Sequence, residues 1–119
     1  MNISQKEIAI AFSNGEFEKT YPFLSKDIVW EIVGENTFKG KENVITNCKQ
    51  TTEYFNSVET IFNTEDVVTS SDRMIVRGTA EFKKEGKRVN FIKACDVYEF
   101  DDEDKIVNIY SYCIQEQSK

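Results

Sequence analysis

Apolar residues recur at helical spacing in the first half of the chain and at every second position in the second half. The helical spacing predicts a first helix that starts at a capping box, in which the side chains of Ser4 and Glu7 each bond an end amide. It also predicts a short helix beginning near Glu16 and a longer one over residues 41–55. Residues 27–34 are rich in β-branched side chains and are interpreted as a strand among these helices.

Polar turns separate the strands expected in the second half. These strands cover residues 58–69, 74–83, 88–100 and 105–115. Residues 37–40 are interpreted as a connection. The order of elements predicts an α+β fold, in which three helices of the N-terminal half pack on one face of a curved mixed, largely antiparallel sheet. Because 119 residues are enough for one core, residues 1–119 are expected to form a single domain.

The net charge of the chain disfavours some classes of binding partner. The net charge is −6, which disfavours contact with nucleic acid and with anionic membranes. The N-terminus has no apolar segment typical of a signal peptide. The three cysteines are odd in number and form no C-x-x-C motif, so reduced thiols and a cytoplasmic location are expected.

Histidine is absent from the chain. Its absence removes the most common general base and the most common metal ligand. The sequence also lacks a glycine-rich phosphate-binding motif and a G-x-S-x-G motif. We therefore expect no metal and no cofactor.

Four segments carry a resemblance to a known superfamily. They are G-E-F-E at residues 15–18, D-I-V-W-E-I-V-G at 27–34, F-K-G-K-E-N-V-I at 38–45 and D-V-Y-E-F-D-D-E-D-K-I-V at 96–107. In this order and spacing they resemble the nuclear transport factor 2-like superfamily, and most closely its SnoaL-like polyketide cyclase and ketosteroid isomerase branch. The resemblance covers essentially the whole chain.

The resemblance implies a cone-shaped α+β barrel with an apolar pocket between sheet and helices. It also implies a homodimer formed through the outer sheet face, which carries Tyr110 and Tyr112. The family's alternation directs one set of strand residues into the pocket: Trp30, Ile32, Val76, Gly78, Ala80, Phe82, Ala94, Asp96, Tyr98, Val107, Ile109, Ser111 and Cys113.

The catalytic positions of the relatives are mostly changed here. The resemblance places Ile32 where ketosteroid isomerases have their carboxylate base and Ile8 where they have an oxyanion-binding Tyr. It places Asp96 at the position of their protonated Asp. The Asp of SnoaL-type cyclases corresponds to Ser111, and its His partner is missing. Neither mechanism is therefore expected in this chain.

Asp96 is the main candidate for chemistry. Its neighbours are apolar or small, so burial is expected to raise its pKa unless it meets a cation. It then acts as acid/base, donates a hydrogen bond to a ligand, or is a purely structural carboxylate. The candidate ligand-binding residues are Trp30, Ile32, Tyr54, Ala80, Phe82, Tyr98, Ile109 and Ser111.

Three functions remain open on the sequence. The first is binding of a small, largely apolar molecule with Asp96 as the polar contact. The second is an isomerase, dehydratase or cyclase that uses Asp96 as acid/base, which needs a second group with a different pKa. The third is a dimeric scaffold whose pocket is filled by Trp30, Phe55 and Phe82.

Overall fold

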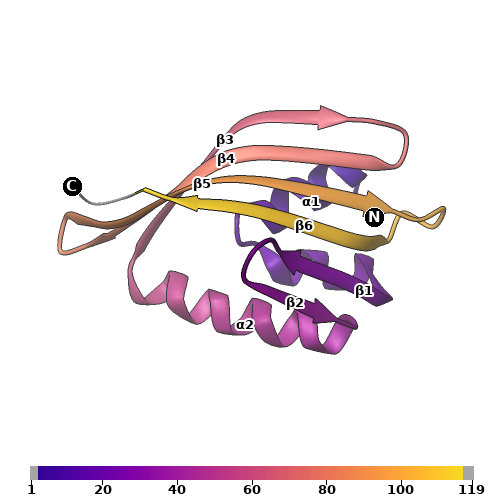
Figure 1. The fold of residues 1–119 in the computed structure, drawn as a ribbon, viewed down its shortest axis with the longest axis horizontal. Helices are drawn as coiled ribbons and strands as arrows, with labels where there is room; N and C mark the ends of the chain where they lie inside the picture. Colours follow the sequence, from indigo (N-terminus) through magenta and orange to yellow (C-terminus); the bar gives the residue numbers. More distant parts are fainter. Residues whose placement is uncertain (1–2, 117–119) are drawn as a thin grey trace.

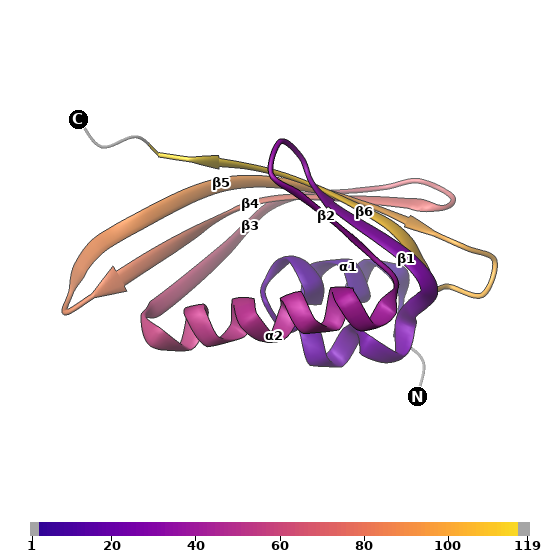
Figure 2. The same cartoon turned by 60° about the horizontal axis from the view of Figure 1, so that its bottom comes forward.

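The computed structural model describes residues 3–116 (Figure 1). The elements are α1 (Gln5–Ser13), the 3-10 helix η1 (Phe17–Phe23), β1 (Leu24–Ile32), β2 (Asn36–Lys39), α2 (Lys41–Ser57), β3 (Glu59–Thr69), β4 (Arg73–Lys84), β5 (Lys87–Phe100) and β6 (Ile106–Gln115). The sheet arches as one curved layer over α1, η1 and α2 (Figure 2). The predicted α+β class with three helices on one sheet is confirmed.

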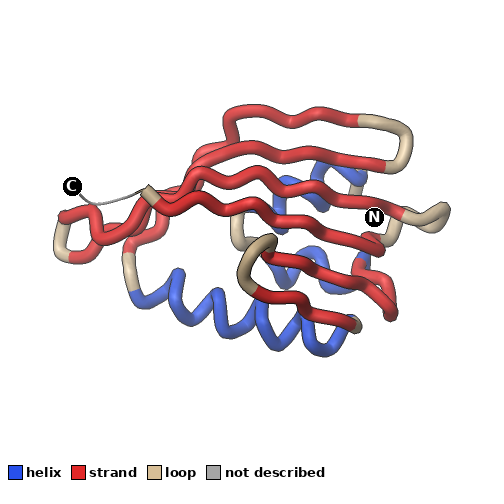
Figure 3. Tube along the Cα trace, viewed as in Figure 1, coloured by secondary structure: helices blue, strands red, loops and turns tan. Residues whose placement is uncertain are grey.

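The six strands form a single sheet in the order β2-β1-β6-β5-β4-β3. Strands β1 and β6 are parallel, whereas the other neighbours are antiparallel. The sheet does not close, since β2 and β3 lie at its two edges. In Figure 3 the strands form this continuous layer, and the described elements after α2 are all strands.

The strand β2 was not predicted from the sequence, which indicated a connection over residues 37–40. Residues Asn36–Lys39 instead pair antiparallel with the end of β1 after a turn at Gly34, whose φ is +84°. This strand is short and only Phe38 packs on the core, so it lacks the apolar alternation that identifies a strand. Phe38 is the ladder partner of Trp30, and this pairing with β1 holds the segment as a strand although its local sequence does not predict one.

The helices begin and end for identifiable reasons. Ser4 Oγ accepts from the Glu7 amide at 3.1 Å and the Glu7 carboxylate accepts from the Ser4 amide at 3.2 Å, which confirms the predicted capping box. The second helix is of the 3-10 type and contains Pro22, which has no amide hydrogen to donate. Helix α2 ends two residues later than predicted, at Ser57.

No helix among residues 3–116 has the length and apolar content needed to cross a bilayer.

The core lies between the concave face of the sheet and the helices. Its fully buried side chains include Ile8, Leu24, Ile28, Val44, Cys48, Tyr98, Ile106 and Ile109. The sequence directed Val107 inward, and this was wrong. The β5–β6 ladder shifts register between Glu99 and Phe100, so that Ile106 rather than Val107 is buried.

Candidate functional site

A cavity of about 260 Å³ lies between the sheet and the helices. The helical part of the chain contributes Phe12, Ser13, Asn14, Phe17, Thr51, Tyr54 and Phe55. The strands contribute Trp30, Ile32, Phe62, Asn63, Thr64, Val76, Gly78, Thr79, Ala80, Phe82, Ile92, Ala94, Asp96, Ser111 and Cys113. Most of these side chains are apolar, and Asp96 is the one lining residue of the described chain with an acidic or basic side chain.

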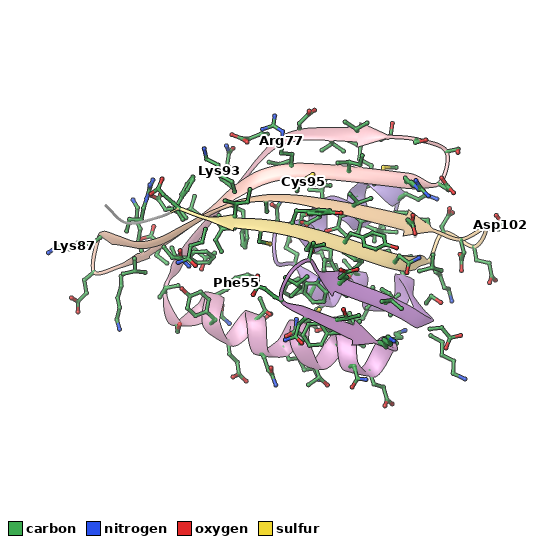
Figure 4. All side chains as sticks on the ribbon, in the orientation of Figure 1. Phe55, Arg77, Lys87, Lys93, Cys95 and Asp102 are labelled. Carbon is green, nitrogen blue, oxygen red and sulfur yellow. The ribbon has the colours of Figure 1, made fainter. Side chains whose placement is uncertain are left out.

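Aromatic rings form much of the cavity wall. Phe55 comes from α2 and is labelled in Figure 4. Its ring stacks on Phe82 with centroids 5.7 Å apart and meets Phe62 edge-on at 5.3 Å. Phe12 meets Trp30 edge-on at 5.0 Å. These packed rings leave few ways for the wall to collapse into the cavity.

Gly78 allows two strands to approach closely beside the cavity. A Cβ atom at this position would lie 2.4 Å from the Asn63 carbonyl oxygen. The β3–β4 ladder shifts register between Thr64 and Asp66, which directs the β3 backbone toward Gly78. The glycine therefore shapes this part of the wall.

Asp96 lines the cavity and is bonded by a hydroxyl group of helix α1. Ser13, the last residue of α1, donates from its hydroxyl to Asp96 Oδ2 at 2.8 Å. The same Ser13 oxygen lies 2.6 Å from the Tyr98 hydroxyl. Because the Ser13 hydrogen is used toward Asp96, Tyr98 donates to Ser13. A chain of hydroxyls thus runs from buried Tyr98 to the carboxylate.

A second chain reaches the same carboxylate from the opposite strand. The Trp30 indole N–H donates to Ser111 Oγ at 3.0 Å. Ser111 is the ladder partner of Asp96, and its hydroxyl is one of the groups that act to lower the pKa of the Asp96 carboxyl. Since an indole N–H can only donate, the single Ser111 hydrogen is available for Asp96. The carboxylate thus accepts from Ser13 on one side and has the Ser111 hydroxyl as its ladder neighbour on the other.

Burial raises the pKa of Asp96, while the hydroxyl groups of Ser111, Ser13 and Tyr98 act in the opposite direction. Burial is the largest of these effects. The salt bridges among the described residues lie elsewhere on exposed or partly exposed side chains, and none includes Asp96. The carboxyl group thus has several hydrogen-bond donors but no cationic partner within the described chain.

Cys113 is the other lining side chain whose ionisation is perturbed. The residue is exposed as a whole, but partial burial of its thiol, with smaller effects of Asp96 and Glu35, raises its pKa to about 11. Cys95 precedes Asp96 on β5 and is a ladder partner of Arg77, which is labelled with it in Figure 4. Burial also raises the pKa of Cys95. Neither thiol is activated as a nucleophile.

The cavity contains six of the eight candidate ligand-binding residues together with Asp96. The six are Trp30, Ile32, Tyr54, Ala80, Phe82 and Ser111. Tyr98 and Ile109 do not line it, because both are fully buried in the core. Tyr98 instead acts through Ser13. Tyr54 remains 44% exposed.

Several lining residues were missed on the sequence. The most important is Ser13, which follows the apolar stripe of the first helix and precedes Asn14-Gly15. Its place at the helix end resembles an ordinary polar terminus, and only the approach of α1 to β5 brings it to Asp96. Phe62 is missed for a related reason, since its face depends on the β3 register.

The fold and this site define a family. Residues 6–109 match the sequence model of the SnoaL-like domain, and the chain belongs to this family. The structure is similar to an NTF2-like protein of unknown function from Cytophaga hutchinsonii, with a TM-score of 0.82 and 31% identity over 91% of this chain and 94% of that one. No curated protein sequence matches this chain significantly.

Two further solved structures share the fold at lower identity. One is an LEH-like epoxide hydrolase from M. tuberculosis, with a TM-score of 0.70 and 19% identity over 92% of this chain and 82% of that one. The other is a SnoaL-like polyketide cyclase, so described provisionally, from Jannaschia, with a TM-score of 0.71 and 10% identity over 95% and 90%. At these identities the similarity concerns the fold alone.

Proposed function

We propose that this protein binds a small, largely apolar molecule in the cavity between the sheet and the helices, with Asp96 as the polar contact. The observation that carries the proposal is a preformed, aromatic-lined cavity with one carboxylate in its wall. Such a combination of apolar walls and few placed polar groups is typical of small-molecule sites. The family's relatives with named activities support a ligand in this place but do not identify it.

The size of the cavity limits the ligand. Its volume of about 260 Å³ is slightly below the range of roughly 300–1,000 Å³ that is usual for drug-sized ligands. The ligand is therefore a molecule with one ring or a short chain rather than a fused polycycle. Tyr54, partly exposed, borders the cavity on the α2 side.

The composition of the cavity favours binding over catalysis. General acid–base catalysis needs two groups whose pKa values are held apart. Asp96 is one such group, but the thiol of Cys113, with a pKa of about 11, stays protonated at neutral pH. An isomerase, dehydratase or cyclase that relies on Asp96 alone is the weaker candidate. An open cavity also disfavours a scaffold with a filled pocket.

The experiment that tests binding uses the single tryptophan, which lines the cavity. Trp30 fluorescence is followed during titration with one-ring and short-chain compounds. Ala94→Leu fills the cavity, and the matched control is Lys93→Leu, one residue away on an exposed position. Figure 4 labels Lys93. Saturable binding that Ala94→Leu removes and Lys93→Leu retains supports the proposal.

Two results contradict this proposal. Binding that Ala94→Leu leaves unchanged places the ligand outside the cavity. If a correctly folded protein shows no saturable fluorescence response to any compound, the scaffold function becomes the better supported one.

We also propose that two copies associate through the outer sheet face. Val76, Asp96 and Ser111 line the cavity, so their neighbours Ile75, Val97 and Tyr110 lie on the opposite face. These three residues are ladder partners in one row that continues to Val68. Nearby Tyr112 is 49% exposed, which suits an aromatic interface.

Sedimentation velocity tests this association. Tyr112→Glu is expected to give a monomer, whereas Gln50→Glu, which adds the same charge to an exposed position on α2, leaves a dimer. A wild-type protein that sediments as a monomer at high micromolar concentration refutes the association. The cytoplasmic location stays a prediction, supported by the free state of Cys48, Cys95 and Cys113.

A further inference from the structure

We propose that the cavity selects a small organic cation: an amine with an apolar substituent, whose ammonium group pairs with the Asp96 carboxylate. This inference rests on the proposed binding function and specifies the chemical class of the ligand. It is carried by hydrogen-bond direction, charge balance and the aromatic wall.

The direction of the hydrogen bonds makes Asp96 an acceptor. The Ser13 hydroxyl donates to Oδ2 and receives its own hydrogen bond from Tyr98. Ser111, the ladder partner of Asp96, accepts from the indole N–H of Trp30, which leaves its own hydrogen available for the carboxylate. These hydroxyl groups favour the charged carboxylate but are outweighed by burial, which raises its pKa as long as no cation is present. A ligand group that contacts the Asp96 carboxylate from the cavity is therefore expected to be another hydrogen-bond donor.

The charge of that carboxylate is not balanced within the described chain. None of the lining residues is Lys or Arg, and the described salt bridges do not include Asp96. A half-buried carboxylate without a cation is costly, and a ligand that brings the cation removes this cost. An ammonium group both donates hydrogen bonds and carries the missing charge.

Helix α1 adds to the same preference. It ends at Ser13, so the residue that bonds Asp96 belongs to the C-terminal turn of the helix. The C-terminal end of a helix carries partial negative charge and attracts cations. The net charge of −6 acts in the same direction at long range.

The aromatic wall suits the rest of such a ligand. Phe12, Phe17, Trp30, Tyr54, Phe55 and Phe62 all border the cavity. The negative faces of aromatic rings attract an organic cation, and the same rings bury its apolar substituent. A carboxylate ligand is repelled by Asp96. A neutral carbonyl ligand would need Asp96 to be protonated and would not supply the charge that the carboxylate lacks.

The test compares ligands of one shape and different charge. Wild-type protein at pH 7 is titrated with 2-phenylethylamine, 2-phenylethanol and phenylacetate, by Trp30 fluorescence and calorimetry. We expect the amine to bind at least tenfold more tightly than the alcohol and the carboxylate to bind most weakly. Asp96→Asn keeps the shape of the site and is expected to abolish the preference for the amine while the alcohol still binds.

The matched control is Asp102→Asn, which removes the same charge from the exposed turn between β5 and β6, labelled in Figure 4. This variant is expected to keep the tenfold preference, which separates pairing at Asp96 from the general effect of net charge. Equal binding of amine and alcohol overturns the inference and leaves the proposed function standing. An amine preference that survives in Asp96→Asn, or a preference for the carboxylate, overturns it as well. No binding of any of the three overturns both.

Discussion

Ser13→Ala tests the hydroxyl chain that joins the core to the cavity. The substitution removes the Ser13 hydroxyl group, which donates to Asp96 at 2.8 Å and whose oxygen lies 2.6 Å from the Tyr98 hydroxyl. Tyr98 is fully buried, so water does not replace the lost partner. The effect on the free energy of unfolding therefore exceeds that of an ordinary surface hydroxyl.

The magnitude follows from the two bonds. A hydrogen bond to a charged group contributes roughly 1.5–3 kcal/mol, and a buried donor left unpaired costs roughly 1–3 kcal/mol. The higher helix propensity of Ala offsets this loss in the free energy of unfolding by about 0.5 kcal/mol at most. We expect Ser13→Ala to lower the free energy of unfolding by about 2–4 kcal/mol at pH 7.

Urea denaturation of four proteins measures this effect: wild type, Ser13→Ala, Tyr98→Phe and the double variant. In the Tyr98→Phe background no phenol is left unpaired, so Ser13→Ala is expected to cost at least 1 kcal/mol less there. Ser71→Ala, in an exposed turn, is the control and is expected to change stability by about 0.5 kcal/mol or less. A Ser13→Ala effect as small as that of the control, or strictly additive effects, would refute the hydroxyl chain.

The other predictions concern the cavity and its walls. Asp96→Asn is expected to raise the free energy of unfolding at pH 7, because burial raises the pKa of this carboxyl and folding then opposes its ionisation. This gain in stability should vanish as the pH falls to about 4, where the carboxyl is protonated in the unfolded chain as well. A gain in stability that does not depend on pH contradicts this reasoning. Gly78→Ala is expected to cost roughly 1–3 kcal/mol in urea denaturation, since its Cβ meets the Asn63 carbonyl oxygen at 2.4 Å, and an unchanged midpoint refutes this contact. Cys113 is expected to alkylate slowly at pH 7, with a rate that rises steeply toward its pKa of about 11. Peptide mass spectrometry measures the extent of alkylation, and rapid labelling at pH 7 would contradict the prediction by showing an activated thiol.

Elements with strong local signals were predictable. The capping box of Ser4 and Glu7 marks the start of α1, and alternation marks β3 to β6 within a few residues. The strand β2 was not predictable, because its four residues acquire their conformation from pairing with β1. The same limit explains Val107, since one bulge in the β5–β6 ladder reverses which residue faces the core.

The candidate site divides in a similar way. Alternation along single strands was sufficient to direct Trp30, Asp96 and Ser111 to one face, and the structure places all three on the cavity. Tyr98 has the same parity but is covered by the core, because the end of α1 packs over that part of β5. Parity predicts a face of the sheet and leaves open which part of that face the helices cover.

Composition and local pattern were sufficient to predict the α+β class, the acidic charge, the lack of histidine and the position of one carboxylate among apolar neighbours. These are properties of composition and of local periodicity, which act over a few residues. Tertiary packing brings Ser13 and Ser111, about a hundred residues apart in the chain, to the two sides of Asp96, and none of the salt bridges among residues 3–116 includes this carboxylate. Hydrogen bonds and cavities depend on distances set by the packing of whole elements, and these distances are not encoded in any single segment.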